Sequence, residues 1–237
     1  MGFLDRIDFG RVKQAFGKAT NKDAIYFPGC TTQKYLPEIA ENYKTILTDL
    51  GVPIRTVEPF CCGKPLKEQG YTEDFEKHKL KIKARLEHDG IKTVITNCAG
   101  CAVTLKEEYG LDVKHTTQVI AEHKRKLQQF NQGEVTFQDN CIAARKLNII
   151  NEPREVLVQT GYRVKEFSEC KKGVRCCGGS CGLQNNASSV SVKVAQRRIR
   201  DAPSNVIVTD DPQCYIQLKK NTQNKEVLEL SETLVEI

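Results

Sequence analysis

The sequence predicts an α/β protein made of two tandem Rossmann-like βαβ repeats with small parallel sheets. Short apolar segments alternate with amphipathic helical segments, which is typical of parallel strands joined by crossover helices. The landmarks of the first half also return in the second half at a nearly constant offset. The equivalent pairs are Cys30 and Cys141, Cys62 and Cys177, Val94 and Ile207, Cys101 and Cys214, and Lys106 and Lys219.

This repetition divides the chain into three expected segments. Residues 24–131 form the first repeat and residues 132–237 the second, with a hinge at Asn131–Gly133. Residues 1–23 form an N-terminal arm in which apolar side chains stand among basic ones. Such an arm suits docking on a partner or on a membrane surface. Packing on its own domain, or fraying, is an equally open alternative.

The elements of the first repeat follow from local patterns. Strands are expected where short apolar runs meet turn residues, at 24–27, 54–57, 93–96 and 111–113. Helices are expected where apolar residues keep helical spacing, at 36–50, 72–88, from Cys101 through Glu108, and at 117–127. Gly51 is expected to end the first of these helices as a C-cap. Pro28–Gly29 predicts a turn that presents Cys30 at the end of the first strand.

The second repeat shows the same order of elements. Strands are expected at 135–138, 162–167, 205–209 and 227–230, and helices at 153–159, 188–200, from Cys214 through Lys220, and at 232–237. Every motif cysteine therefore falls at the carboxyl end of a predicted strand. In open parallel sheets this edge is where ligands bind. We expect three cysteine loops, distant in sequence, to meet in one crevice per repeat.

Composition and charge exclude several classes of protein. The chain has 237 residues, a net charge of +6 that is spread among acidic residues, and no tryptophan, so a nucleic-acid surface is not expected. It has no apolar run long enough for a transmembrane helix, and residues 1–6 carry charges where a signal peptide needs an apolar core. We therefore expect a cytoplasmic protein. Its eleven cysteines then favour metal or redox chemistry over structural disulfides.

The two vicinal cysteine pairs are the centre of this chemistry. Cys61–Cys62 and Cys176–Cys177 cannot readily close disulfides within each pair, because an unstrained bridge needs a particular geometry. Each pair is followed by a glycine, which permits a sharp turn and a close approach to the backbone. The remaining cysteines of the two sets are Cys30, Cys98 and Cys101 in the first, and Cys141 and Cys214 in the second. The pattern predicts two metal–sulfur pockets.

The number of thiols favours an iron–sulfur cluster over zinc. Structural zinc takes four ligands, usually from two close knuckles, and only Cys98–Cys101 is such a knuckle. No histidine is expected near the cysteine loops, because His78, His88 and His123 fall on helices and His115 has no counterpart in the second repeat. Five thiols in one set and four in the other match a cluster whose several irons each need sulfur.

These motifs resemble the cysteine-rich CCG domain found in heterodisulfide reductases and their relatives. The relatives include iron–sulfur subunits of glycolate and lactate oxidation systems and of some archaeal succinate or fumarate reductases. The resemblance covers the chain from about Ala24 onward. It implies one or two four-iron clusters, with a noncubane cluster at the first site, where a disulfide is split one sulfur at a time. The implied ligands are Cys30, Cys61, Cys62, Cys98 and Cys101 at the first site, and Cys141, Cys176, Cys177 and Cys214 at the second.

The second repeat departs from the complete pattern. Asp211 stands where Cys98 has its equivalent, so that Asp211-Pro212-Gln213-Cys214 replaces the second CxxC. Four thiols could hold an ordinary four-iron cluster, or Cys181 could supply a fifth. A single cysteine at this place also resembles the glycolate and lactate branch. We therefore expect an active first site and leave the type of the second open.

The chain lacks a ferredoxin-type cysteine run and a flavin fingerprint, so electrons are expected from other polypeptides. The expected partners are a ferredoxin-like iron–sulfur subunit and a flavoprotein subunit, with possible peripheral membrane association through the complex. Lys64 and Lys67 could steer an anionic substrate or stabilise cluster charge. Cys170 is interpreted as an incidental thiol, and Asp139 and Asn140 as turn residues.

Three alternatives remain open. The chain could relay electrons in a membrane-linked dehydrogenase without catalysing a reaction itself. Cys98–Cys101 could act as a dithiol redox motif at a helix start, where the helix dipole lowers a thiol pKa. The cysteines could also hold zinc in a scaffold without a redox role.

Overall fold

Two small parallel sheets, one in each repeat, form the framework of the molecule. The computed structural model describes residues 24–58, 60–129 and 133–235. The expected arm at 1–23, and Asn131 and Gln132 of the expected hinge, lie outside this range. The first sheet has the order β1-β2-β3, with β1 (Ala24–Tyr26), β2 (Thr93–Thr96) and β3 (Asp112–His115). The second has the order β5-β4-β6-β7, with β4 (Glu134–Phe137), β5 (Arg163–Lys165), β6 (Val206–Thr209) and β7 (Glu226–Glu229).

Helices connect and cover these strands, as expected for an α/β protein. The first repeat contains α2 (Gly29–Tyr35), α3 (Pro37–Asp49), α4 (Lys64–Glu68), α5 (Thr72–His88), α6 (Ala99–Tyr109), α7 (Thr116–Glu122) and the short turn η2 (Lys124–Lys126). The second contains η3 (Ala143–Leu147), α8 (Glu152–Gln159), η4 (Lys171–Gly173), α9 (Leu183–Asn186), α10 (Ser188–Arg200), α11 (Pro212–Asn221) and η5 (Leu230–Thr233). The fold class predicted from the sequence is confirmed.

The strand expected at 54–57 is wrong. Only Arg55 pairs with β1, donating to the Ala24 carbonyl at 3.1 Å and accepting from the Tyr26 amide at 3.3 Å. Pro53 lacks an amide proton and starts the segment at the sheet edge, so the pairing does not extend into a ladder. The bridge still lies beside β1 where β5 lies beside β4, so the two sheets share one topology.

Several element boundaries also differ from the expectation. Cys30 lies in the first turn of α2 instead of a bare turn, and Pro37 at the start of α3 separates the two helices. The helix expected at 117–127 ends at Glu122 and continues as the separate 3₁₀ turn η2. The helix expected at 232–237 is the 3₁₀ turn η5 within the described residues. The strand expected at 162–167 is only three residues long.

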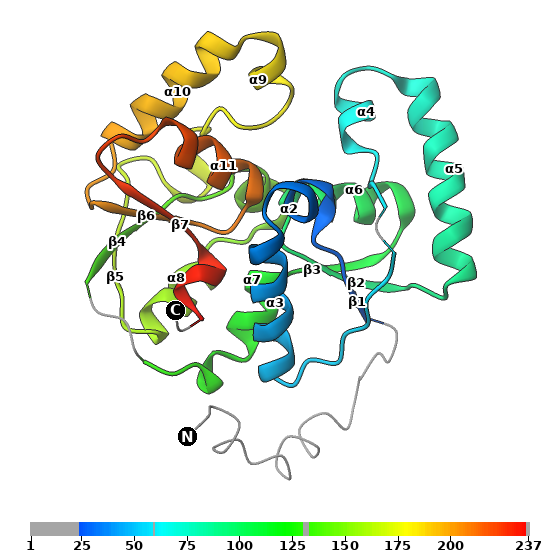
Figure 1. Ribbon diagram of the computed structural model, residues 1–237, viewed down its shortest axis with the longest axis horizontal. Coiled ribbons are helices and arrows are strands. Elements are labelled where there is room, and N and C mark those ends of the chain that lie inside the picture. Colours follow the sequence, from blue (N-terminus) through cyan, green and yellow to red (C-terminus); the bar gives the residue numbers. More distant parts are fainter. Residues whose placement is uncertain (1–23, 59, 130–132, 236–237) are drawn as a thin grey trace.

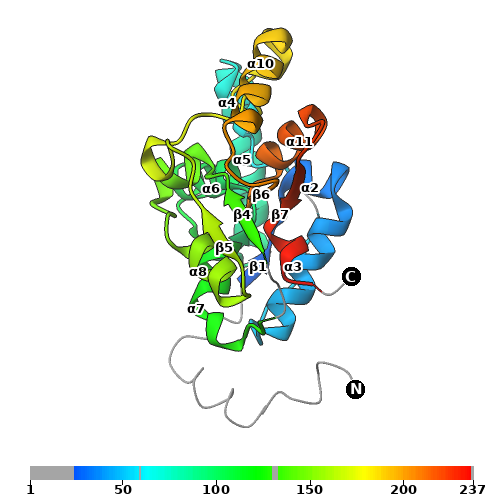
Figure 2. The same ribbon diagram turned by 90° about the vertical axis from the view of Figure 1, so that its left-hand side faces the viewer.

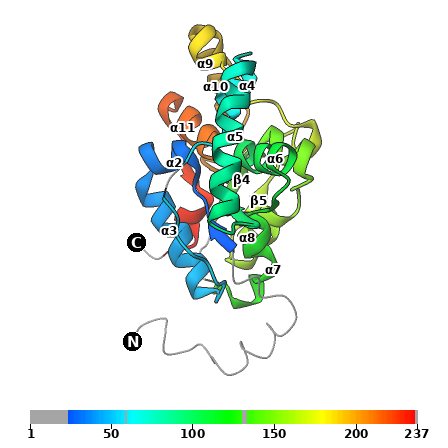
Figure 3. The same ribbon diagram turned by 90° about the vertical axis from the view of Figure 1, so that its right-hand side faces the viewer.

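Two helical arms protrude at the same end of the molecule. One consists of α4 and α5 and the other of α9 and α10, and each follows one of the vicinal cysteine pairs. The three views place both arms beyond the sheets, with α2, α6 and α11 between them (Figures 1, 2 and 3). None of the described helices is long and apolar enough to cross a membrane.

A buried hydrogen-bond network joins the two repeats. Tyr43 of α3 donates through its hydroxyl to Glu229 at 2.6 Å, and both side chains are fully buried. The other carboxylate oxygen accepts from the amide of Ser231 at 2.8 Å and from its hydroxyl at 2.5 Å. Burial raises the pKa of Glu229 to about 8 despite these donors.

The raised pKa of Glu229 predicts a specific pH dependence of stability. An exposed glutamate ionises near pH ~4.3, so the folded chain retains a proton that the unfolded chain loses between that pH and about 8. The free energy of unfolding therefore falls as pH rises through this window. Glu229→Gln removes this titration. Between pH 6 and 8 the wild-type protein should lose about 2 kcal/mol more than the variant.

Urea unfolding of both proteins at pH 6, 7 and 8 measures this difference. Comparing the two proteins cancels the contributions of the other titrating groups. Parallel pH profiles for wild type and Glu229→Gln would show that Glu229 is ionised in the folded protein.

Candidate metal centre

The first set of cysteines comes together at the carboxyl end of the first sheet. Cys30 lies at the start of α2 after β1, and Cys98 is the N-cap of α6 after β2. Cys101 lies in the first turn of α6, and Cys61–Cys62 immediately precede α4. Side-chain contacts connect all five thiols in the order Cys30, Cys61, Cys62, Cys101 and Cys98. The Sγ atoms of Cys62 and Cys101 are 3.4 Å apart.

The second set repeats this arrangement with four thiols. Its contacts run in the order Cys141, Cys176, Cys177 and Cys214. The Sγ atoms of Cys177 and Cys214 are 3.1 Å apart. We call these two groups the first pocket and the second pocket. The sequence predicted that these nine cysteines form two groups, and the structure brings the members of each group together.

Both pockets have a buried floor and an accessible mouth. Cys62, Cys98 and Cys101 are buried in the first pocket, as are Cys177 and Cys214 in the second. The mouth of each pocket holds two more accessible cysteines, Cys30 with Cys61 in the first and Cys141 with Cys176 in the second. Reactants or partners can therefore approach from the side of these pairs.

The glycine after each vicinal pair shapes its loop. Gly63 and Gly178 both have φ +83°, which confirms the expected sharp turns. In this conformation the Gly63 amide donates to the Sγ of Cys61 at 3.4 Å, and the Gly178 amide donates to Cys176 at 3.2 Å. Amide donors of this kind favour a negatively charged sulfur.

Contacts between the thiols split their pKa values. A hydrogen bond from Cys101 is the main reason that the pKa of Cys62 lies well below its usual range, while the pKa of Cys101 is raised well above it. In the second pocket a hydrogen bond with Cys141 lowers the pKa of Cys176, and the pKa of Cys141 is raised. Each pocket thus has one thiol with strong thiolate character, the form that binds metals.

The donor set of both pockets fits an iron–sulfur cluster in its chemistry. It consists of soft thiols with amide donors directed at sulfur, which is the ligand type that such clusters use. In the part of the chain that the structure describes, no three His, Cys, Asp or Glu side chains are grouped so that they could hold a single metal ion. The thiols contact one another in a row instead.

The remaining residues singled out in the sequence lie in different places. Cys181 is exposed and contacts Glu68 of the first repeat at 3.8 Å, next to Ser180. Lys64 donates to Glu68 at 2.6 Å and to Ser180 at 3.3 Å, so it lies between the two vicinal-cysteine loops. Lys67 is paired with Glu108, away from this position.

The two residues before Cys141 do more than form a turn. Asp139 is buried and forms an ion pair with Arg154 at 2.8 Å. Asn140 accepts from the amides of Ile142 and Ala143, and its side-chain nitrogen lies 3.6 Å from the Sγ of Cys214. Cys170 contacts Glu166 and is partly buried, which agrees with an incidental thiol.

Two expectations about histidine are wrong. His78 lies beside a cysteine loop, because its Nε2 is 2.8 Å from the Cys61 carbonyl oxygen. Its position on α5 opposite the loop could not be read from helical spacing. His115 does have a counterpart, since it ends β3 and caps α7 with a capping box, as Glu229 ends β7 and caps η5. The pair was missed because the two residue types differ.

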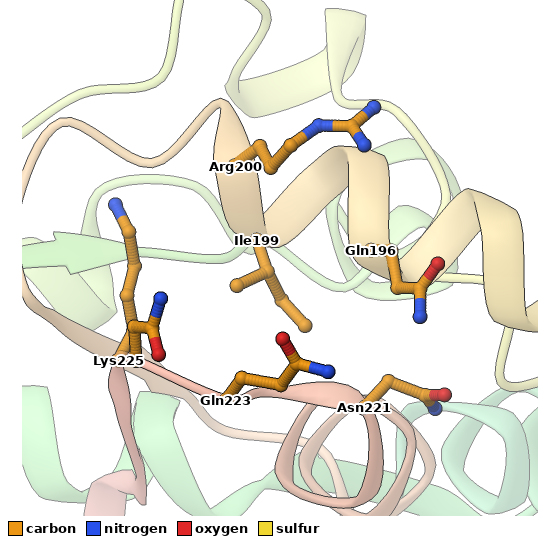
Figure 4. A pocket seen from close by; sticks show the side chains of 7 residues that line it. Gln196, Ile199, Arg200, Asn221, Gln223 and Lys225 are labelled. Carbon is orange, nitrogen blue, oxygen red and sulfur yellow. The ribbon is translucent and has the colours of Figure 1, made fainter.

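A surface pocket of about 310 Å³ lies apart from these cysteines. It is formed by α10 and the segment after α11, with Gln196, Ile199, Arg200, Asn221, Gln223 and Lys225 around it (Figure 4). Its described lining contains amides, an isoleucine and two cations but no cysteine. This pocket therefore does not belong to the thiol site.

The architecture defines a class of protein before any comparison: an α/β duplication with one cysteine pocket at the same sheet edge of each repeat. The family model of the CCG cysteine-rich domain matches residues 24–106 and again 135–219. The chain therefore belongs to the CCG cysteine-rich domain family, as the sequence motifs predicted.

Curated relatives lie at about one quarter identity. One subunit of the CoM/CoB fumarate reductase of Methanothermobacter marburgensis is 26% identical, over 94% of this chain and 46% of the relative. One subunit of the CoB–CoM heterodisulfide reductase of Methanosarcina barkeri is 28% identical, over 76% of this chain and 48% of the relative. Lactate utilization protein A 2 of Bacillus cereus is 23% identical, over 88% of this chain and 96% of the relative. The chain thus spans about half the length of the first two.

Proposed function

We propose that the chain is the iron–sulfur subunit of a heterodisulfide reductase-like redox complex. In this proposal the first pocket holds a four-iron cluster of noncubane type, at which a disulfide is cleaved or formed. The observation that carries it is the meeting of five thiols from three separate loops beneath an accessible mouth. Subunits of heterodisulfide and fumarate reductases among the relatives support it.

The residues of the first pocket divide into two roles. Buried Cys62, Cys98 and Cys101 would hold the cluster from below, where the surrounding core excludes water. Cys30 and Cys61 would hold it at the mouth, leaving one side open to a substrate. An iron–sulfur cluster, when bound, supplies electrons one at a time.

Lys64 provides a positive charge beside this mouth. Its ion pair with Glu68 outweighs burial and raises the pKa of Lys64, so the ammonium stays charged at neutral pH. We expect it to favour the negative charge of a thiolate-bound cluster or of an anionic thiol substrate.

The alternative is a subunit that transfers electrons without reacting with sulfur. Asp211 in place of a second CxxC cysteine leaves the second pocket with four thiols, which suits an ordinary four-iron cluster. The match to a lactate utilization protein over 96% of its length favours this alternative. In this role the chain would serve a glycolate-, lactate-, succinate- or fumarate-type dehydrogenase complex.

In either role the chain would act with other subunits, in the cytoplasm or peripherally at a membrane through its complex. The first two relatives are about twice as long as the matched region. A ferredoxin-like subunit and a flavoprotein would deliver the electrons that the described pockets need, since this sequence has neither a ferredoxin run nor a flavin fingerprint.

Anaerobic purification followed by iron, sulfide and zinc analysis tests the proposal, together with EPR spectroscopy. Iron and acid-labile sulfide should be bound, and the EPR signal should change when a thiol or disulfide is added. Bound cluster with a signal that ignores both additions would favour the electron-transfer alternative. Zinc without sulfide would overturn both.

A further inference from the structure

The two pockets are joined at their ligand loops, and Asp211 is the central connection. This carboxylate is 2% exposed and lies immediately after β6, where the first repeat has a cysteine. One of its oxygens accepts from the amides of Gln213 at 3.0 Å and Cys214 at 3.2 Å, so it caps α11. The other oxygen accepts from the amide of Ala99 at 3.3 Å.

The Ala99 amide belongs to the other repeat. Ala99 follows Cys98 directly and is the first residue of α6, the helix that also carries Cys101. A single buried carboxylate therefore binds the starts of two helices, and each helix carries a cysteine of a different pocket. A carboxylate near two helix N-termini is also favoured by both helix dipoles.

Two further contacts join the same loops. Gln213, next to Cys214, donates to the hydroxyl of Thr31, next to Cys30, at 2.7 Å. Lys64 of the first vicinal-cysteine loop donates to Ser180 of the second at 3.3 Å. These contacts are at part-buried positions, whereas the Asp211 bond is buried.

We propose that Asp211 is a positioning residue that couples the two cysteine pockets, so that a change in one alters the ligand loop of the other. This inference rests on the proposed function in one respect, namely that the pockets hold clusters. Both oxygens of Asp211 are committed to amide donors, so the residue shapes the loops and leaves ligation to the thiols. It replaces a cysteine of the second pocket with a bond to the first.

Asp211→Ser separates the bridge from the helix cap. Serine is a good N-cap for α11, but its shorter side chain cannot also reach the Ala99 amide. Asp211→Asn is the second variant, because it keeps the size of the side chain and replaces one acceptor oxygen by a donor. Asn140→Asp is the matched control, since it removes the contact with Cys214 and should keep the turn that Asn140 caps.

The first measurement uses the metal-free chain and follows amide hydrogen exchange. Exchange at Ala99 should be roughly tenfold or more faster in Asp211→Ser, because a hydrogen bond to a buried carboxylate is lost. Asn140→Asp should leave Ala99 exchange unchanged. Unchanged exchange at Ala99 in both Asp211 variants would overturn the proposal.

The second measurement uses the chain loaded with iron and sulfide. Asp211→Ser should shift the EPR signal of the first pocket, although Asp211 lies in the second repeat, whereas Asn140→Asp should shift only the second signal. A shift confined to the second pocket in Asp211→Ser would overturn the coupling. If wild type binds no iron and sulfide, the proposed function fails, and the exchange experiment still decides the role of Asp211.

Discussion

Replacing Cys62 by serine should abolish cluster binding in the first pocket and leave the second pocket loaded. Cys62 lies in the middle of the row of five thiols, between Cys61 and Cys101. It is 2% exposed, and its carbonyl is held by the hydroxyl of Tyr109 at 3.1 Å. A serine hydroxyl at this buried position is a poor iron ligand and has no strong thiolate-like donor to offer.

Iron and sulfide content together with EPR would measure this effect. The first pocket's share of iron and its signal should be lost, while the signal from Cys177 and its neighbours remains. Cys170→Ser is the control, because Cys170 lies outside both pockets and its iron content should match wild type. Full iron content in Cys62→Ser would exclude the first pocket as a cluster site.

Replacing Gly179 by alanine should destabilise the protein by ~1–3 kcal/mol and disturb the second pocket. A Cβ atom at this position would lie 2.5 Å from the Gln213 carbonyl oxygen and 2.9 Å from the Cβ of Gln217. Both belong to α11, the helix that carries Cys214. A backbone oxygen cannot turn aside as a flexible side chain can, so the loop and α11 must move apart.

Gly173→Ala is the matched control for this prediction. A Cβ atom at Gly173 would meet no atom within 4 Å, so the change in stability should stay within about 0.5 kcal/mol. Urea unfolding gives the stability difference, and EPR of the loaded chain shows which pocket changes. Equal stability of the two variants would mean that α11 does not pack against Gly179 as the structure shows.

Much of the fold could be predicted because it is encoded locally. The helix at 72–88 and the strand at 93–96 were expected at the residues where they occur, since apolar spacing and turn residues define both. The strand at 54–57 failed because its pairing is tertiary, with hydrogen bonds only at Arg55. The contact of His78 with the Cys61 carbonyl failed for the same reason, since α5 and the cysteine loop meet only in the folded chain.

By itself, the sequence determined the duplication, the α/β class and the two sets of cysteines, because spacing and residue type are sufficient to recognise a repeated motif. Only the tertiary structure decided how the two sets relate to each other. Asp211 reads in the sequence as a missing cysteine, yet its carboxylate binds the Ala99 amide of the opposite repeat. The physical reason is that a buried carboxylate needs donors, and the nearest unpaired ones are the amides at the two helix starts. No local pattern contains this contact, because it joins residues that only folding brings together.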